Sequence, residues 1–130
     1  MREEVVVKII ESQLNIAERA FNNLHGTMFS KNGSPDFLTM DISGRFVGIE
    51  AKAPGKSPYV NQYRRAIEIL LSGGRYVVAQ EDFLLDELDK DKLKKLQIGS
   101  EIGISEFEAV DNKIVGTTEI VIQAKKKNKN

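Results

Sequence analysis

The sequence predicts an α/β domain in which a mixed central sheet is flanked by helices. An apolar hairpin at residues 37–51 is followed by a helical stripe at residues 59–72 and a short apolar strand at residues 76–79. A second helical stripe, at residues 3–22, precedes them. The expected order is therefore helix, three strands, helix and strand, and then a further helix and a C-terminal hairpin.

The composition is that of an ordinary folded domain. The chain has 130 residues, of which 41% are hydrophobic and 29% are charged. With no repeats and no linker, we expect one domain at residues 1–124, with a core at residues 1–80 and an extension at residues 81–124. The basic segment 125–130 is predicted to be a disordered tail.

Several classes of site are excluded by residue type. The chain has no cysteine, which excludes disulfides, thiolate zinc sites and cysteine nucleophiles. Its single histidine, His25, excludes a multi-histidine zinc site and is expected to be a solvated or capping residue. There is no apolar run long enough for a membrane span and no signal-peptide pattern, so we expect a cytoplasmic protein without a membrane partner.

The first 34 residues are predicted to form a helix, a short strand and a glycine-containing loop that leads to the hairpin. Residues 3–22 carry the helical stripe, although Val5-Val6-Val7 would also suit a strand. A short strand is expected at residues 27–30. Lys31 and Ser34 then stand where they could either contact a phosphate or form a plain turn, and both interpretations stay open.

The hairpin brings charged side chains together. One strand is expected at residues 37–42 and the other at residues 45–51, joined by a turn at Ser43-Gly44. Asp36 opens the first strand and Glu50 lies near the end of the second, so pairing places them side by side. Lys52 lies two residues beyond Glu50 and points to the same face. Two carboxylates and one ammonium group therefore converge at one end of the sheet.

This combination suits a hard divalent cation. Mg²⁺ prefers oxygen ligands and usually takes one or two carboxylates from the protein. Asp36, Glu50 and the Ala51 carbonyl can supply three oxygens, and Lys52 can orient water or neutralise charge on a phosphate. The alternative is a surface hairpin with a cross-strand ion pair.

The residues around the hairpin favour the metal-site interpretation. Gly33, Pro35, Asp36, Glu50, Lys52 and Gln62 occur in an order that resembles the PD-(D/E)xK nuclease superfamily. The spacing is most similar to the small stand-alone VRR-NUC proteins of phages, and it is also similar to archaeal Holliday-junction resolvases. The resemblance covers residues 1–80. Ala51 departs from it, since a β-branched residue is commoner there.

The resemblance implies a restriction-endonuclease-like fold and a Mg²⁺- or Mn²⁺-dependent endonuclease acting on DNA phosphodiester bonds. It implies Asp36, Glu50 and the Ala51 carbonyl as metal ligands, with no protein nucleophile and no small-molecule cofactor. Glu4 matches a metal-binding glutamate of the first helix, and a solvated helix face is its equal alternative. Gln62 is implied to bind water or phosphate beside Lys52, and its alternative is a solvent-facing helix residue.

The charge distribution points to a nucleic acid partner despite a net charge of zero. From residue 44 to residue 80 there are six basic residues and two acidic ones, which predicts a basic face that binds phosphates. An ordinary mixed surface is the alternative. RNA is not separated from DNA by the sequence, and a non-catalytic nucleic-acid-binding or assembly protein of the same fold remains the rival function. The predicted DNA contacts are Lys31, Ser34, Lys56, Arg64 and Arg65.

The last third of the chain has a pattern but no recognisable motif. Residues 82–97 are predicted to form one charged helix or two short ones, and residues 101–110 and 113–123 a hairpin turning at Asp111-Asn112. The apolar residues of this hairpin either extend the sheet or pair with a second chain. A homodimer that prefers branched or four-way DNA is therefore a hypothesis of the sequence.

Overall fold

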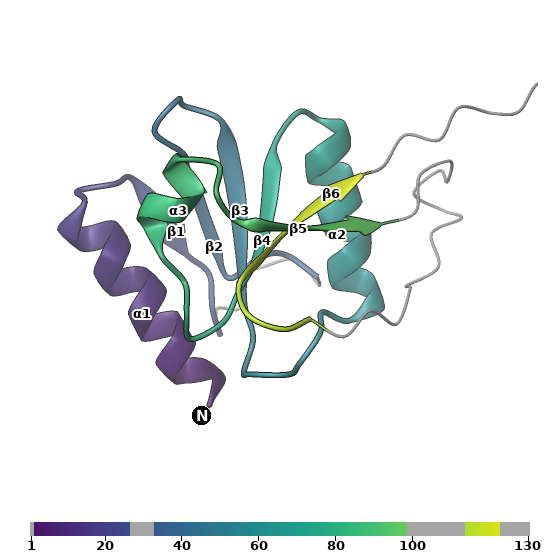
Figure 1. Ribbon diagram of the computed structural model, residues 1–130, viewed down its shortest axis with the longest axis horizontal. Coiled ribbons are helices and arrows are strands. Elements are labelled where there is room, and N and C mark those ends of the chain that lie inside the picture. Colours follow the sequence, from purple (N-terminus) through teal and green to yellow (C-terminus); the bar gives the residue numbers. More distant parts are fainter. Residues whose placement is uncertain (1, 27–32, 99–113, 123–130) are drawn as a thin grey trace, which may run out of the picture.

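The structure is a computed structural model that describes residues 2–26, 33–98 and 114–122. The described residues form a six-stranded mixed sheet flanked by helices, which confirms the α/β class (Figure 1). The elements are α1 (Glu3–Ile16), β1 (Phe21–Asn23), β2 (Phe37–Met40), β3 (Phe46–Ala51), α2 (Val60–Leu71), β4 (Arg75–Ala79), α3 (Leu85–Asp89), β5 (Lys94–Ile98) and β6 (Thr118–Ile122).

The sheet has the strand order β1-β2-β3-β4-β6-β5. The first three strands are antiparallel, β3 and β4 are parallel, and β6 runs antiparallel to β4 and parallel to β5. The segment 81–124, predicted as an extension of the core, thus contributes α3, β5 and β6, and both strands join the same sheet as β1–β4.

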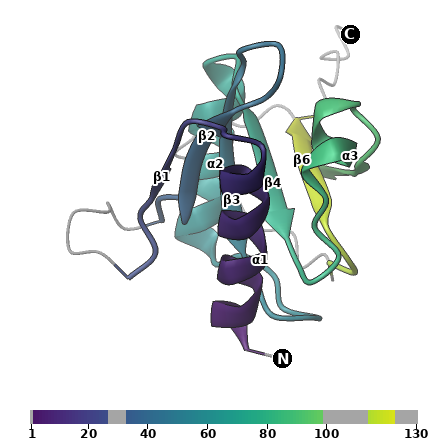
Figure 2. The same cartoon turned by 90° about the vertical axis from the view of Figure 1, so that its left-hand side faces the viewer.

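Two apolar layers cover the two faces of the sheet. On one face α1 and α3 bury residues such as Ile10 and Leu88 against Phe37 and Val77. On the other face α2 buries Ile67 among the residues packed with Tyr76 and Ile120. Figure 2 shows α1 in front of the strands and α2 behind them. Successive residues of the central strands alternate between these layers, as the pleat of a strand requires.

The predicted hairpin and the helix after it are confirmed, with strands one or two residues shorter than expected. β2 and β3 pair from Phe37↔Ile49 to Met40↔Phe46. The turn between them is built by Asp41, whose Oδ1 accepts hydrogen bonds from the N–H groups of Ser43 and Arg45. Gly44 has φ +88°, which suits glycine.

The helix predicted over residues 3–22 is wrong at its C-terminal end. It stops at Ile16, Glu18 takes φ +52°, and Phe21–Asn23 form the edge strand β1. Arg19 anchors the turn by pairing with Asp89 at 2.7 Å and donating to the Met40 carbonyl at 2.9 Å. This long-range anchoring ends the helix where the sequence itself carries no glycine or proline.

The prediction of one charged helix or two short ones in residues 82–97 is wrong for the second half of that segment. Only Leu85–Asp89 are helical, Asp91 takes φ +55°, and Lys94–Ile98 form the strand β5. β5 pairs with β6 from Lys94↔Thr118 to Ile98↔Ile122, so a partner distant in sequence selects the extended conformation.

Three other predictions fall outside the described residues. They are the strand at residues 27–30, the first strand and turn of the C-terminal hairpin, and the tail at residues 125–130. β6 lies within the predicted second strand of that hairpin, and it extends the protein's own sheet. Among the described residues, no helix has the length and apolar character needed to cross a membrane.

Arg75 and Arg45 do not form part of a free basic face, contrary to the expectation. Arg75 is 4% exposed and pairs with Glu119 at 2.7 Å, Asp41 at 2.9 Å and Asp91 at 2.9 Å. Arg45 pairs with Asp41 at 2.7 Å. Burial alone would raise the pKa of Asp41, but hydrogen bonds from Ser43 and both arginines hold that pKa well below its usual range. These charges stabilise the end of the sheet where β3 and β4 begin.

Candidate active site

Asp36 and Glu50 lie beside the end of β3. The first turns of α1 and α2 lie at the same edge of the sheet, at the bottom of Figure 1. The pairing of Phe37 with Ile49 continues by one residue to place Asp36 next to Glu50. The site is therefore produced by the hairpin register.

Asp36 is held by two donors, one on each oxygen. Its Oδ2 accepts a hydrogen bond of 2.8 Å from the Ala51 N–H, and its Oδ1 lies 2.8 Å from His25 Nδ1. The N–H and C=O of one strand residue point to the same side, so the Ala51 carbonyl is also directed toward Asp36. The use of that carbonyl as an oxygen ligand stays a prediction.

Pro35 fixes the chain just before Asp36. A Cβ placed on Gly48 would come within 2.7 Å of the Pro35 ring, so glycine allows the ring to lie directly on β3. Gly33, with φ +86°, passes against the first turn of α2, where an added Cβ would lie 2.4 Å from the Asn61 carbonyl oxygen. The close neighbour of Gly33 is therefore the backbone of Asn61, at the start of α2.

Glu50 is the most deeply buried carboxylate of the site, with 2% of its surface exposed. Its Oε1 accepts a 2.8 Å hydrogen bond from Gln62 Nε2. Within the part of the chain that the structure describes, its buried Oε2 has no hydrogen-bond partner. Burial and the negative charge of Asp36 raise the pKa of Glu50 to about 9, against the opposing effect of Lys52. A buried acidic oxygen without a partner is an unfavourable arrangement that a bound cation would relieve.

Lys52 is buried beside Glu50, as the two-residue spacing predicted. Its Nζ lies 3.7 Å from Glu50 Oε1 and 4.0 Å from Glu3 Oε1. The same ammonium group stacks on the Tyr59 ring, 4.4 Å from the ring centroid. Tyr59 itself is 71% exposed, so one aromatic ring covers the lysine at the edge of the site.

Gln62 faces the site, as expected, and both ends of its amide are used. Its Oε1 accepts the Tyr59 N–H at 2.8 Å, which closes the first turn of α2, and its Nε2 donates to Glu50. In this arrangement Gln62 contacts the acidic residue directly, whereas the sequence suggested that it contacts water or phosphate.

Among the first-helix glutamates, the structure brings Glu3 to the site. Glu3 Oε1 approaches Lys52, and Glu3 Oε2 lies 3.9 Å from His25 Nδ1. Glu4, the predicted ligand, is exposed on α1. Adjacent residues of a helix point about 100° apart, so a shift of one position moves the side chain off the site.

His25 is the site residue that sequence reasoning missed. It was expected to be solvated or capping, yet it contacts Asp36. Its position depends on the pairing of β1 with β2, in which Asn23 lies opposite Phe37. The available signal is its place two residues beyond an Asn-Asn pair, but the predicted helix at residues 3–22 covers the first two residues of β1.

The predicted DNA contacts lie in different surroundings. Lys56 and Arg64 are exposed on the loop and helix after Lys52, and Ser34 is partly buried just before Pro35. Arg65 is paired with Glu68. Lys31 lies outside the described residues.

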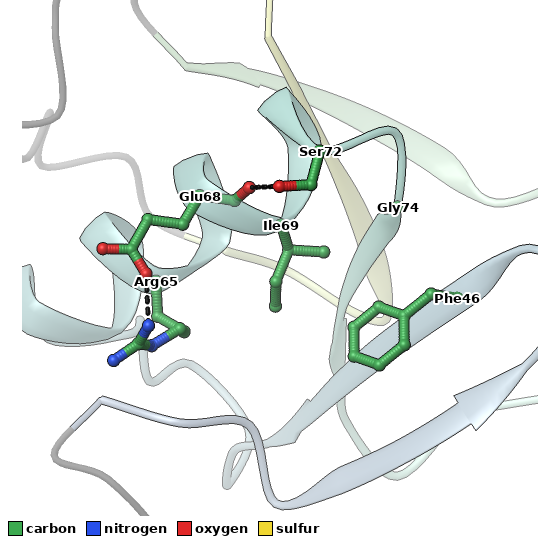
Figure 3. Close-up of a pocket in the computed structure, with 6 residues that line it drawn as sticks. All are labelled: Phe46, Arg65, Glu68, Ile69, Ser72 and Gly74. Carbon is green, nitrogen blue, oxygen red and sulfur yellow. Dashed lines mark hydrogen bonds and ion pairs between the residues drawn. The ribbon is translucent and has the colours of Figure 1, made fainter.

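A pocket of about 320 Å³ lies between α2 and the start of β3, and neither Asp36 nor Glu50 lines it (Figure 3). The Arg65–Glu68 ion pair lies along one side of it, and Ile69 and Phe46 give it an apolar floor. None of its lining residues is a proposed metal ligand. They are Phe46, Arg65, Glu68, Ile69, Ser72 and Gly74.

The donor set that could hold a metal is small. Across residues 2–26, 33–98 and 114–122, no group of three or more His, Asp or Glu side chains is arranged to hold an ion. Asp36, Glu50 and the Ala51 carbonyl make a set of two carboxylates and one carbonyl, which is sufficient for Mg²⁺ when water completes its coordination. Glu50 Oε2, which accepts no hydrogen bond from the residues that the structure describes, fits this use.

Comparison of the chain with family models, with curated proteins and with solved structures finds no match in any of the three. Inferences about function therefore rest on the geometry of the site.

Proposed function

We propose that this protein is a Mg²⁺- or Mn²⁺-dependent endonuclease of the PD-(D/E)xK type that hydrolyses phosphodiester bonds in DNA. The observation that carries the proposal is the state of Glu50, a buried acid beside Asp36 and Lys52 with one oxygen that has no hydrogen-bond partner among the described residues. A purely structural role would not require two acids at one end of the sheet with so little compensating charge.

The ligands would be Asp36, Glu50 and the Ala51 carbonyl. A divalent cation bound there lowers the pKa of a coordinated water and offsets charge on the phosphate under attack. The two hydrogen bonds to Asp36 fix that carboxylate, and Gln62 fixes Glu50. The protein thus orients both acids before any ligand arrives, which lowers the cost of binding.

Lys52 supplies the positive charge of the site. It is a movable donor that can leave Glu50 for a phosphate oxygen once a cation compensates the acid. Tyr59 holds the ammonium group at the exposed edge in the meantime. Exposed Lys56 and Arg64 lie on the chain segment that follows and would contact phosphates farther along the DNA.

The direct test is cleavage and metal binding with paired variants. Asp36→Asn and Glu50→Gln should each reduce cleavage by at least about two to three orders of magnitude, comparable to removing a key electrostatic group. Both should also weaken Mn²⁺ binding measured by calorimetry. Asp86→Asn, which changes an exposed aspartate of α3, is the matched control and should leave both quantities unchanged.

Other results of these cleavage and metal-binding tests would assign a different function to the protein. DNA binding without Mn²⁺ uptake would favour the non-catalytic binding protein, and cleavage confined to RNA would change the substrate class. Near-normal cleavage by either acid variant would place the active site elsewhere.

We also propose a homodimer that prefers branched or four-way DNA, because symmetric cutting of a junction requires two sites. Ile114 and Ile120 are buried in the protein's own core, so they do not support a dimer contact. Light scattering at micromolar concentration tests the dimer, and competition between linear and four-way DNA tests the preference. A monomer that cuts all duplexes equally would leave only the general nuclease proposal.

A further inference from the structure

His25 makes a direct contact with the first proposed metal ligand. Its Nδ1 lies 2.8 Å from Asp36 Oδ1, while the Ala51 N–H donates to Asp36 Oδ2 at the same distance. The two atoms are within hydrogen-bond distance, and an ionised carboxylate accepts this bond from a protonated Nδ1. Donors on both oxygens fix the rotation of the Asp36 carboxylate about its own axis.

The backbone that carries His25 is held in place by a series of hydrogen bonds. The backbone N–H of His25 donates to Asn23 Oδ1 at 3.0 Å, and Asn23 Nδ2 donates to Glu11 Oε2 of α1 at 2.7 Å. The neighbouring Leu24 N–H donates to the Asp36 carbonyl at 2.7 Å. The loop that carries His25 is thus tied to the helix on one side and to the start of β2 on the other.

Asp36 needs such support because it precedes the regular strand. β2 begins at Phe37, so the ladder bonds that hold Phe37 to Ile49 do not fix the Asp36 side chain. Each carboxylate oxygen has two lone pairs, so a hydrogen bond from His25 leaves Oδ1 able to bind a cation. Histidine can therefore orient Asp36 without competing for the ligand position.

We infer that His25 is a positioning residue that holds Asp36 in the orientation required for metal binding. The inference rests on the proposed function, since it assigns a role toward the same metal site. Removal of a residue that orients a metal ligand typically weakens metal affinity by about 10- to 100-fold. If His25 only stabilised the loop, its removal would lower the free energy of unfolding and leave the metal affinity of the folded protein unchanged.

Three substitutions separate the atoms of the ring. The amide nitrogen of asparagine reaches a position near Nδ1, whereas the amide of glutamine reaches a position near Nε2. His25→Asn should keep the Mn²⁺ dissociation constant within about threefold of the wild type, whereas His25→Gln and His25→Ala should raise it by about 10- to 100-fold. Calorimetry with MnCl₂ and the full chain, without DNA, gives the constants, and urea unfolding gives the folded fraction of each variant.

Asp36→Asn is measured in the same series to separate the two proposals. If Asp36→Asn abolishes Mn²⁺ binding but His25→Ala does not change it, the positioning role is wrong and the metal site stands. If Asp36→Asn leaves Mn²⁺ binding intact, the metal site itself is wrong. If His25→Ala does not fold, the comparison of His25→Asn with His25→Gln decides, and equal constants for these two would overturn the inference.

Discussion

Gln62 Nε2 donates a 2.8 Å hydrogen bond to Glu50 Oε1 while Gln62 Oε1 accepts the Tyr59 N–H at 2.8 Å. One side chain therefore closes the first turn of α2 and fixes the buried acid of the site. The start of a helix and the orientation of Glu50 are coupled, so a change at Gln62 should affect both folding and metal binding.

Replacing Gln62 tests this coupling. Gln62→Ala should lower the free energy of unfolding by about 1 kcal/mol, because it removes the helix-closing bond and the bond to Glu50. Gln62→Glu keeps an acceptor for Tyr59 but directs a third acid at Glu50, so Mn²⁺ should raise its melting temperature more than it raises that of the wild type. Gln97→Glu, at an exposed position of β5, is the control. Equal Mn²⁺-induced shifts in all three proteins would contradict the prediction.

Lys52 should be required for turnover but not for metal binding. Lys52→Ala removes a positive charge 3.7 Å from Glu50, so the remaining acids attract a cation at least as strongly as before. Cleavage should fall by at least about two orders of magnitude. Calorimetry with Mn²⁺ and single-turnover cleavage measure the two effects. A loss of Mn²⁺ affinity as large as that of Glu50→Gln would show that the assignment of Lys52 is wrong.

Glu50 should make the metal-free protein less stable as the pH rises. Its pKa is raised from 4.5 to about 9 in the fold, so its contribution to stability is complete below about pH 4.5 and is lost as the pH rises toward 9. Without metal at pH 8, Glu50→Gln should therefore increase the free energy of unfolding by at least about 1.4 kcal/mol, the equivalent of one pKa unit. Urea unfolding in EDTA at several pH values measures the difference, which should be smallest at pH 4. A variant less stable than the wild type at pH 8 would refute this.

The buried ion pairs of Arg75 should contribute far more to the stability of the fold than the partly exposed ion pair of Arg45. Arg75→Met leaves buried Asp41 and Glu119 without their main partner and should cost about 3–5 kcal/mol of stability. Arg45→Met removes a guanidinium whose side chain is 47% exposed and should cost less than about 1 kcal/mol. Urea unfolding at neutral pH compares them. Similar losses for the two variants would mean that burial is not what gives the network its importance.

The parts of the fold that the sequence predicted well are those determined by local pattern. The hairpin at residues 37–51 and the helix α2 have strong periodicity and clear turn residues, so the placement of Asp36, Glu50 and Lys52 followed from their spacing. The orientation of Gln62 toward the site was predicted from its position at the start of that helix.

The features that were missed depend on partners distant in sequence. α1 ends early because Arg19 binds Asp89, seventy positions later, and β5 is extended because β6 pairs with it. His25 reaches Asp36 only because β1 forms an edge strand. Arg75 appeared to be a surface charge because nothing near it in sequence indicates that Glu119 would meet it.

The position of β6 has a consequence for the order of folding. β6 comes after β5 along the chain, yet it lies between β4 and β5 in the sheet. During synthesis β1–β4 can pair early, but β4 remains an open edge and β5 has no neighbour until residues 118–122 emerge. The half that carries Asp36 and Glu50 can thus assemble before Glu119, the partner of Arg75 on β6, is available. In that interval the open edge of β4 is the surface most exposed to aggregation, and a chain ending at residue 98 should remain in this state.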